Sequence, residues 1–109
     1  MTMDTANNAV DMAMPYRRRT VDVNGVHLSV IVEGEGPDVL LVHGFPDDST
    51  VWRHQIPALV AAGYRVIVPD TRGCGDSSIP ERTADYKIEK LVADLVGVLD
   101  ALGIRKVRL

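Results

Sequence analysis

The hydrophobic positions of the first half of the chain indicate β-strands. Residues 39–42 read Val-Leu-Leu-Val with no polar alternation, which is typical of a strand covered on both faces of a sheet. We therefore predict a buried strand over residues 38–43, near the centre of the sheet. Upstream, a strand starting at Arg18 and another over Val26–Glu33 flank Asn24-Gly25, the dipeptide most typical of a tight hairpin turn.

Helical spacing of apolar residues appears in two later segments. The first predicted helix begins near Trp52 and ends at Gly63, and the second covers residues 87–102. The residues that share an apolar face are Trp52, Ile56, Leu59 and Val60 in the first helix, and Ile88, Leu91, Val92, Leu95, Leu99 and Leu102 in the second. The residues suited to capping the first helix are Asp47, Asp48 and Ser49. With a strand over residues 64–69 between them, the alternation of strands and helices predicts an α/β fold with βαβ connections.

Composition narrows the classes of partner. Of the 109 residues, 46% are hydrophobic and 25% charged, and the net charge of −3 gives no basic footprint for nucleic acid. The one dense basic cluster, Arg17 to Arg19, is interpreted as a solvated start of a strand. No apolar stretch reaches the roughly 20 residues that cross a membrane, and the start of the chain lacks a secretory signal pattern. Residues 1–16 are expected to be a disordered leader, and a single cysteine fits a reducing, cytoplasmic setting.

Four sequence blocks carry a resemblance to a known family. They are His43-Gly44-Phe45-Pro46, residues 52–59, residues 63–70 and residues 72–78, in that order along the chain. With this spacing, residues 21–109 resemble the α/β-hydrolase superfamily and, within it, the epoxide hydrolases and the haloacid dehalogenases. The resemblance implies the N-terminal portion of an α/β-hydrolase fold. Residues 17–109 would form a mostly parallel sheet of order 1-2-4-3-5, with an antiparallel N-terminal hairpin and flanking helices.

The same resemblance implies a reaction class. An epoxide hydrolase opens a small apolar organic substrate with an aspartate nucleophile through an ester intermediate, which water hydrolyses with help from a histidine, and no cofactor or metal takes part. No Gly-x-Ser-x-Gly or Gly-x-Asp-x-Gly occurs in the sequence, so the nucleophile, its acid and the catalytic histidine are expected beyond Leu109. A haloacid dehalogenase, a serine esterase and a non-catalytic fragment remain alternatives, and oligomeric state stays open.

One candidate site residue acts through its backbone. In the resembling enzymes, the N–H group at the position of Phe45 is one donor of the oxyanion hole, which stabilises the negative oxygen formed during the reaction. His43, Gly44 and Pro46 are expected to support this loop, with Phe45-Pro46 in the cis form. His43 is therefore interpreted as structural rather than as a general base.

The second candidate loop, residues 70–78, is expected to be structural. Its glycines, Gly73 and Gly75, would make the turns, while Asp70, Arg72 and Asp76 could pair with one another or with backbone groups. Two other interpretations of this loop are disfavoured. A dinucleotide site would need a third glycine and an opening helix, and a thiol nucleophile at Cys74 would need a positioned base.

The histidines do not predict a metal site. His27, His43 and His54 match no ligand spacing and fall on a strand, a strand end and a helix.

Overall fold

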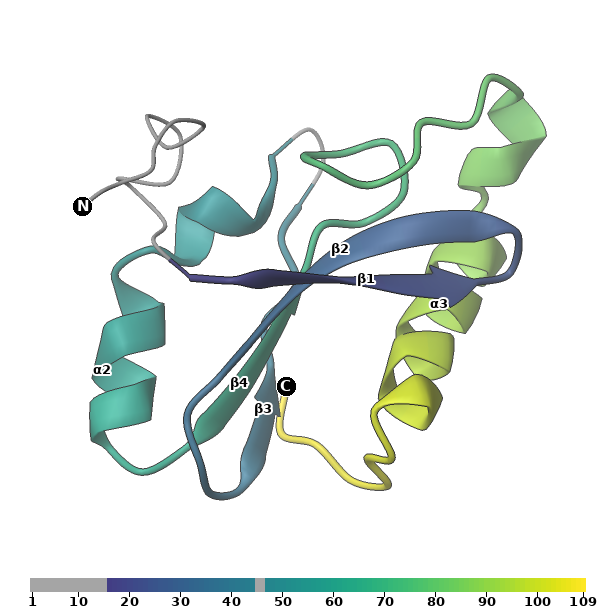
Figure 1. Cartoon of the computed structure of the whole chain (residues 1–109). Coiled ribbons are helices and arrows are strands. Elements are labelled where there is room, and N and C mark those ends of the chain that lie inside the picture. The colour runs from purple at the N-terminus through teal and green to yellow at the C-terminus, as the bar shows by residue number, and fades with distance from the viewer. Residues whose placement is uncertain (1–15, 45–46) are drawn as a thin grey trace.

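The computed structural model describes residues 16–44 and 47–109. Its four named strands form one mixed sheet of order β1-β2-β4-β3 (Figure 1). The strands are β1 (Arg18–Val23), β2 (Val26–Glu33), β3 (Asp38–Leu40) and β4 (Arg65–Pro69). Pairing is antiparallel between β1 and β2 and between β2 and β4, and parallel between β3 and β4. Val39 also forms a parallel bridge with Arg108, so the chain end lies beside β3, where the predicted order places a fifth strand.

The β1–β2 hairpin turns as predicted. Asn24 and Gly25 both have positive φ, at 48° and 82°, and this backbone twist matches that of the flanking strands. In this register, Arg18 is opposite Ile31, which in turn pairs with Val68. The start of β1 therefore lies level with the carboxyl end of β4.

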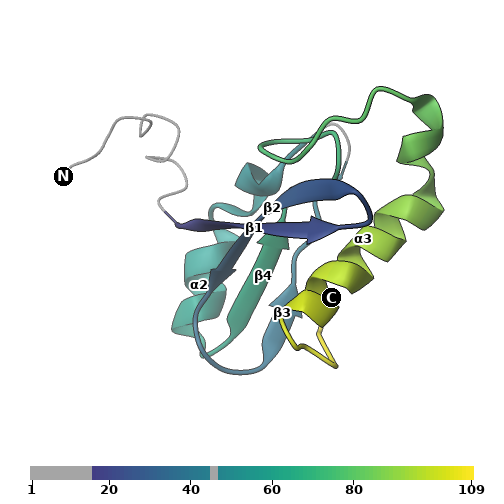
Figure 2. The same cartoon turned by 45° about the vertical axis from the view of Figure 1, so that its right-hand side comes forward.

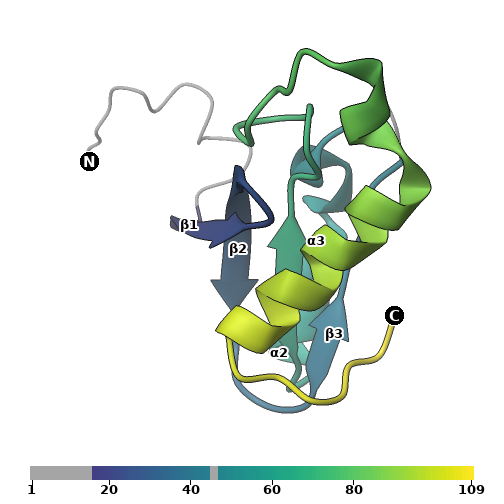
Figure 3. The ribbon, with the colours of Figure 1, turned by 90° about the vertical axis from the view of Figure 1, so that its right-hand side faces the viewer.

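Two helices cover opposite faces of the sheet (Figures 1 and 2). On one face, α2 (Gln55–Ala61) packs its Ile56 against β-strand residues such as Ile31 and Val68. On the other face lies α3 (Ile88–Ala101), as Figure 3 shows. Its Val98 packs against a second cluster that includes Leu28 and Ile67. Alternate residues of the strands thus belong to two separate hydrophobic clusters, one on each face, as expected for a sheet buried on both sides.

The structure corrects the predicted start of the first helix. Residues Ser49–Trp52 form a short 3-10 helix, η1, and α2 begins only at Gln55. Pro57 explains the break, because it lacks the N–H that an α-helix from Trp52 would bond to Arg53, whereas its place in the first turn of α2 needs no such bond. Asp48 still caps the segment as predicted, since its carboxylate accepts from the Thr50 N–H at 2.9 Å.

The remaining differences between the predicted elements and the structure are small. The buried strand is shorter than predicted and ends at Leu40, although the Leu41 N–H still donates to the Ile67 carbonyl at 3.0 Å. A second 3-10 helix, η2 (Thr83–Tyr86), lies in a segment for which no element was predicted. Tyr16, assigned above to the leader, packs against the α2-side cluster. None of the helices in the described residues is long and apolar enough to span a bilayer.

Candidate functional site

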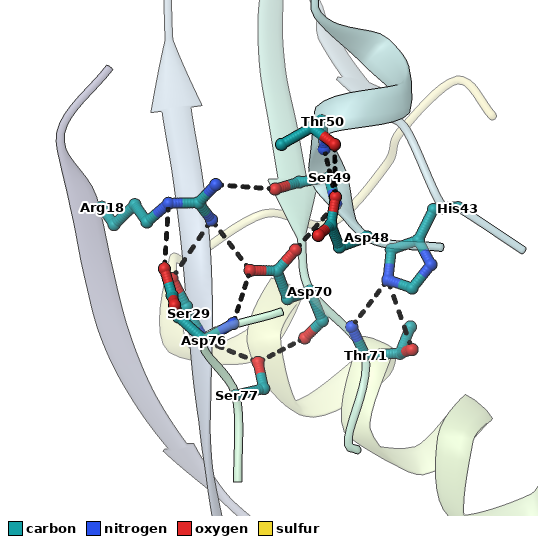
Figure 4. Close-up of polar contacts among 10 residues, drawn as sticks. All are labelled: Arg18, Ser29, His43, Asp48, Ser49, Thr50, Asp70, Thr71, Asp76 and Ser77. Atoms are coloured by element: carbon teal, nitrogen blue, oxygen red, sulfur yellow. Dashed lines mark hydrogen bonds and ion pairs between the residues drawn. The ribbon is translucent and has the colours of Figure 1, made fainter. Parts of the chain in front are cut away.

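The candidate site lies where β3 and β4 end. Two loops meet there: one follows β3 from Leu41 and reaches η1, and the other follows β4 over residues 70–78. Open α/β sheets place their ligands at this edge, beyond the carboxyl ends of the parallel strands. Figure 4 shows the polar side chains that join the two loops.

Asp70 is the junction of this network. Its side chain is 1% exposed, and its two oxygens accept from groups on both loops. Oδ1 accepts the Ser49 N–H at 2.7 Å, and Oδ2 accepts the Asp76 N–H at 3.2 Å. A buried carboxylate is costly unless it is both hydrogen-bonded and paired with a cation. The cation is Arg18, whose Nη1 lies 2.9 Å from Oδ2.

Arg18 binds more than Asp70. Its Nη2 donates to the Ser49 hydroxyl at 2.9 Å, its Nη1 also contacts the Ser29 hydroxyl at 3.3 Å, and its Nε is 3.6 Å from the Asp76 carboxylate. The prediction of a merely solvated cluster is therefore wrong for Arg18, which is half-buried and paired, whereas its neighbours Arg17 and Arg19 are exposed. This pairing could not be predicted from local sequence patterns, because it depends on the β1–β2–β4 register.

Ser77 fastens the second loop to the sheet. Its hydroxyl donates to the Asp70 carbonyl at 2.5 Å and accepts the Ser29 N–H at 2.9 Å. The Asp70 N–H in turn donates to the Ser29 carbonyl at 2.8 Å, which continues the β2–β4 pairing. Asp70 is thus fixed by its backbone as well as by its side chain.

The His43 side chain is buried, and both of its ring nitrogens have partners. Nε2 accepts the Thr71 N–H at 3.0 Å, so this nitrogen carries no proton. Nδ1 lies 2.8 Å from the Gly44 carbonyl, which only accepts, so Nδ1 carries the proton. The ring is therefore a neutral link between the two loops. Both ring nitrogens are thus engaged within the two loops, and the supporting role of His43 stays a prediction.

The two glycines of the second loop are required by its shape. Gly75 has φ +52°, and a Cβ there would lie 2.4 Å from the Asp70 carboxylate. Gly73 has φ +83°, and a Cβ there would lie 2.4 Å from the Tyr86 ring. By contrast, a Cβ on Gly44 would meet no described atom within 4 Å. At Gly73 and Gly75 the absence of a side chain thus allows the turns and the close approach of neighbouring atoms.

Arg72 belongs to a second ion pair on the α3 side. Its Nε and Nη2 donate to the two oxygens of Asp94 at 2.6 and 2.8 Å, and its Nη1 donates to the Asp85 carbonyl at 2.8 Å. The backbone contact fits the predicted pairing, but the carboxylate comes from the helix and not from the loop. Hydrogen bonding by Asp94 raises the pKa of Arg72 above its ordinary value.

Asp48 contributes negative charge beside the first loop. Hydrogen bonds from the Thr50 hydroxyl and the Thr50 N–H hold the pKa of its carboxyl below its ordinary value. Asp48 is therefore ionised at neutral pH, while it caps η1.

An apolar cavity of about 630 Å³ adjoins the site on its α3 side. It is lined by Val42 and His43 from the first loop, Thr71 and Gly73 from the second, Tyr86, and α3 residues including Ile88, Leu91 and Leu95. A cavity of this size and character could accept a small apolar molecule or an apolar part of a protein chain.

The described residues include no group of three or more His, Cys, Asp and Glu side chains placed to hold a metal ion. His27 pairs with Asp22 and is exposed, and Cys74 is a buried free thiol. Phe45 and Pro46 lie outside the described residues, so the oxyanion donor and the cis peptide bond stay predictions.

Comparison with known proteins places this geometry in a family. A family model described as alpha/beta hydrolase fold matches residues 37–109, which include both loops of the site. The chain belongs to the α/β-hydrolase family.

Among the relatives of this α/β hydrolase, Epoxide hydrolase A of Mycobacterium tuberculosis is 54% identical over 90 residues, which cover 81% of the chain and 28% of the relative. Among solved structures, an epoxide hydrolase from Vigna radiata has a TM-score of 0.81 at 49% identity, covering 84% of this chain and 30% of that one. Epoxide Hydrolase A from Mycobacterium thermoresistibile has a TM-score of 0.80 at 51% identity, with the same coverage. The chain therefore spans under a third of the length of these relatives.

Proposed function

We propose that this chain supplies the oxyanion-binding part of an epoxide hydrolase. The observation that carries the proposal is that the loop bearing His43-Gly44-Phe45-Pro46 is anchored on both sides. His43 is bonded to Thr71, and Ser49 is bonded to Asp70 and Arg18. A loop fixed in this way suits the preorganised backbone donors that oxyanion stabilisation needs. The relatives named as epoxide hydrolases supply the reaction class.

In this proposal the substrate is a small apolar epoxide. An aspartate carried by the rest of the enzyme attacks an epoxide carbon and the ring C–O bond breaks. The ring oxygen takes a proton from an acid that the rest of the enzyme also carries, which leaves an ester between the aspartate and the substrate. Water then attacks the ester carbonyl, whose oxygen becomes negative in the tetrahedral intermediate. The Phe45 N–H would donate to that oxygen, and the neutral His43 ring would keep the loop in place. The reaction needs no cofactor or metal, and a reducing, cytoplasmic setting would suit the free thiol of Cys74.

A hybrid enzyme tests the proposal. Residues 16–109 replace the aligned segment of Epoxide hydrolase A from Mycobacterium tuberculosis, and the hybrid is assayed with styrene oxide, a haloacetate and a p-nitrophenyl ester. We expect hydrolysis of the epoxide. Because the host supplies the aspartate nucleophile, the hybrid tests the oxyanion-binding part alone, and no turnover by a folded hybrid would favour a non-catalytic role.

Two substitutions then isolate the backbone donor. Phe45→Pro removes the N–H, whereas Phe45→Leu keeps it and changes only the side chain. Loss of one oxyanion donor lowers kcat by about 10² to 10³-fold in a well-studied protease, and we expect a loss of that order for Phe45→Pro alone. Equal effects of the two substitutions would contradict a role for the backbone donor.

A further inference from the structure

One arginine outside the loops of the site binds both of them. Arg18 begins β1, the edge strand of the sheet, and its guanidinium reaches Asp70, Ser49 and Asp76. We propose that Arg18 is a positioning residue for the reaction, one that fixes the downstream end of the loop between His43 and Ser49. The inference rests on the proposed function only in assigning the oxyanion donor to that loop.

The first step in the argument is that Ser49 is held twice. Its N–H donates to Asp70 Oδ1 at 2.7 Å, and its hydroxyl accepts from Arg18 Nη2 at 2.9 Å. Ser49 is fully buried, so water does not replace these partners when they are lost. Both bonds depend on Arg18, one directly and the other through the charge that Arg18 provides to Asp70.

The second step is that only an arginine matches the three acceptors. Nη1 points to Asp70, Nη2 to the Ser49 hydroxyl, and Nε lies toward Asp76, so each nitrogen of the planar group has its own partner (Figure 4). A lysine would keep the positive charge but offers a single nitrogen at the end of a flexible stem. Charge and geometry can therefore be separated by substitution.

The third step concerns the two ends of the loop. His43 ties the upstream end to Thr71, and the Arg18 network ties the downstream end at Ser49. Release of the Ser49 end would loosen the connection between this anchor and His43, and in the proposed function that connection carries the oxyanion donor. A misplacement of about 1 Å can cost about 10²-fold in rate. Arg18 thus acts on catalysis through the loop and without touching the substrate.

Hydrogen exchange on the 109-residue chain tests the anchoring without reference to activity. In Arg18→Gln we expect the Ser49 amide to exchange about tenfold faster or more, because its bonded partner loses its counter-charge, while amides inside β2, such as that of Val30, keep their protection. Arg19→Gln removes an exposed neighbouring charge and should leave Ser49 unchanged. Equal exchange of Ser49 in the two variants would overturn the proposal.

A second variant covers the case in which Arg18→Gln leaves Asp70 charged, buried and destabilising. The double variant Arg18→Gln with Asp70→Asn carries no charge at either position, and Arg18→Lys retains the positive charge at position 18. We expect faster exchange of Ser49 in both, with the lysine variant intermediate. Wild-type exchange in a folded Arg18→Lys chain would show that charge alone anchors the loop and would overturn the geometric part of the proposal.

The kinetics of the hybrid enzyme distinguish a positioning role from a merely structural one, because a merely structural role would not change kcat while leaving KM the same. We expect Arg18→Lys to lower kcat by about tenfold with KM nearly unchanged, because the loop acts on the intermediate more than on substrate binding. Unchanged kcat together with faster Ser49 exchange would overturn the positioning role and leave the proposed function standing. A folded but inactive hybrid would count against the proposed function, while the exchange data would still decide the anchoring.

Discussion

Two arginine–aspartate pairs flank the loop after β4, and they differ in the parts of the molecule that they connect. On the α3 side, Arg72 and Asp94 meet through two parallel hydrogen bonds, and their side chains are 3% and 2% exposed. On the α2 side, Arg18 is 20% exposed and meets Asp70 through one nitrogen, while the other Asp70 bonds go to backbone N–H groups. The first pair joins a loop to a helix, and the second joins the start of β1 to the loops of the site.

This difference separates a stabilising pair from a positioning one. The Arg72–Asp94 pair has little capacity left for other partners, apart from the Asn24 amide at 3.1 Å and the Asp85 carbonyl. In contrast, the oxygens of Asp70 accept hydrogen bonds from the segments that carry the site. Damage to the first pair should therefore lower global stability, and damage to the second should change the loops before it changes the fold.

The largest expected effect comes from breaking the α3-side pair. Arg72→Gln leaves the Asp94 carboxylate buried without a cation, which typically costs about 3–5 kcal/mol in the free energy of unfolding. Urea unfolding followed by circular dichroism measures this loss. Replacement of both partners, as in Arg72→Met with Asp94→Leu, should cost less than the sum of the single changes, because no charge is left alone.

Arg105 offers a matched control for this prediction. It is an exposed arginine near the end of α3, and Arg105→Gln should change the free energy of unfolding by no more than about 0.5 kcal/mol. A similar small effect for Arg72→Gln would mean that the buried pair contributes no more than a surface charge.

The second expected effect is steric and lies on the α2 side. Gly75→Ala places a Cβ 2.4 Å from the Asp70 carboxylate at φ +52°, so both the turn and the aspartate must shift. We expect a loss of about 2 kcal/mol or more, since positive φ and the clash add. Gly25→Ala is the control, because φ there is +82° but no atom lies within 4 Å, so only the backbone cost remains. Equal melting temperatures of the two variants would show that Asp70 is not rigidly held.

The contrast between the two pairs also shows how far the sequence could be interpreted. Local patterns predicted the hairpin at Asn24-Gly25, the buried run after Asp38 and the helix that ends before Gly103, because each depends on neighbours in the chain. The prediction of a structural role for the glycine-rich loop rests on the same kind of local pattern. The ionic partners were missed, since Arg18 is 52 residues from Asp70 and Arg72 is 22 residues from Asp94. Only the strand register and helix packing bring these charges together.

A third, smaller effect is expected from Arg18→Gln on global stability. Hydrogen bonds to charged groups contribute about 1.5–3 kcal/mol each, but Arg18 is partly solvated, so we expect a loss near the lower end of that range. Calorimetric or urea unfolding of Arg18→Gln and Arg72→Gln shows directly which substitution lowers the free energy of unfolding more. If Arg18→Gln were the more destabilising, the assignment of a stabilising and a positioning pair would have to be reversed.

The smallest expected effect concerns Asp48, the cap of η1 in the first loop. The Thr50 hydroxyl and N–H hold the pKa of its carboxyl below 3.8, so the ionised form is favoured in the folded chain. The stability that this provides is fully present above pH 3.8 and is lost as the pH falls through the lower, folded-state pKa. Asp48→Ala should cost about 1 kcal/mol at pH 7, as for other lost caps. Urea unfolding at pH 7, 5 and 3 should show the difference between the two proteins shrinking only at the lowest pH, whereas a difference that grows on acidification would contradict an ionised cap.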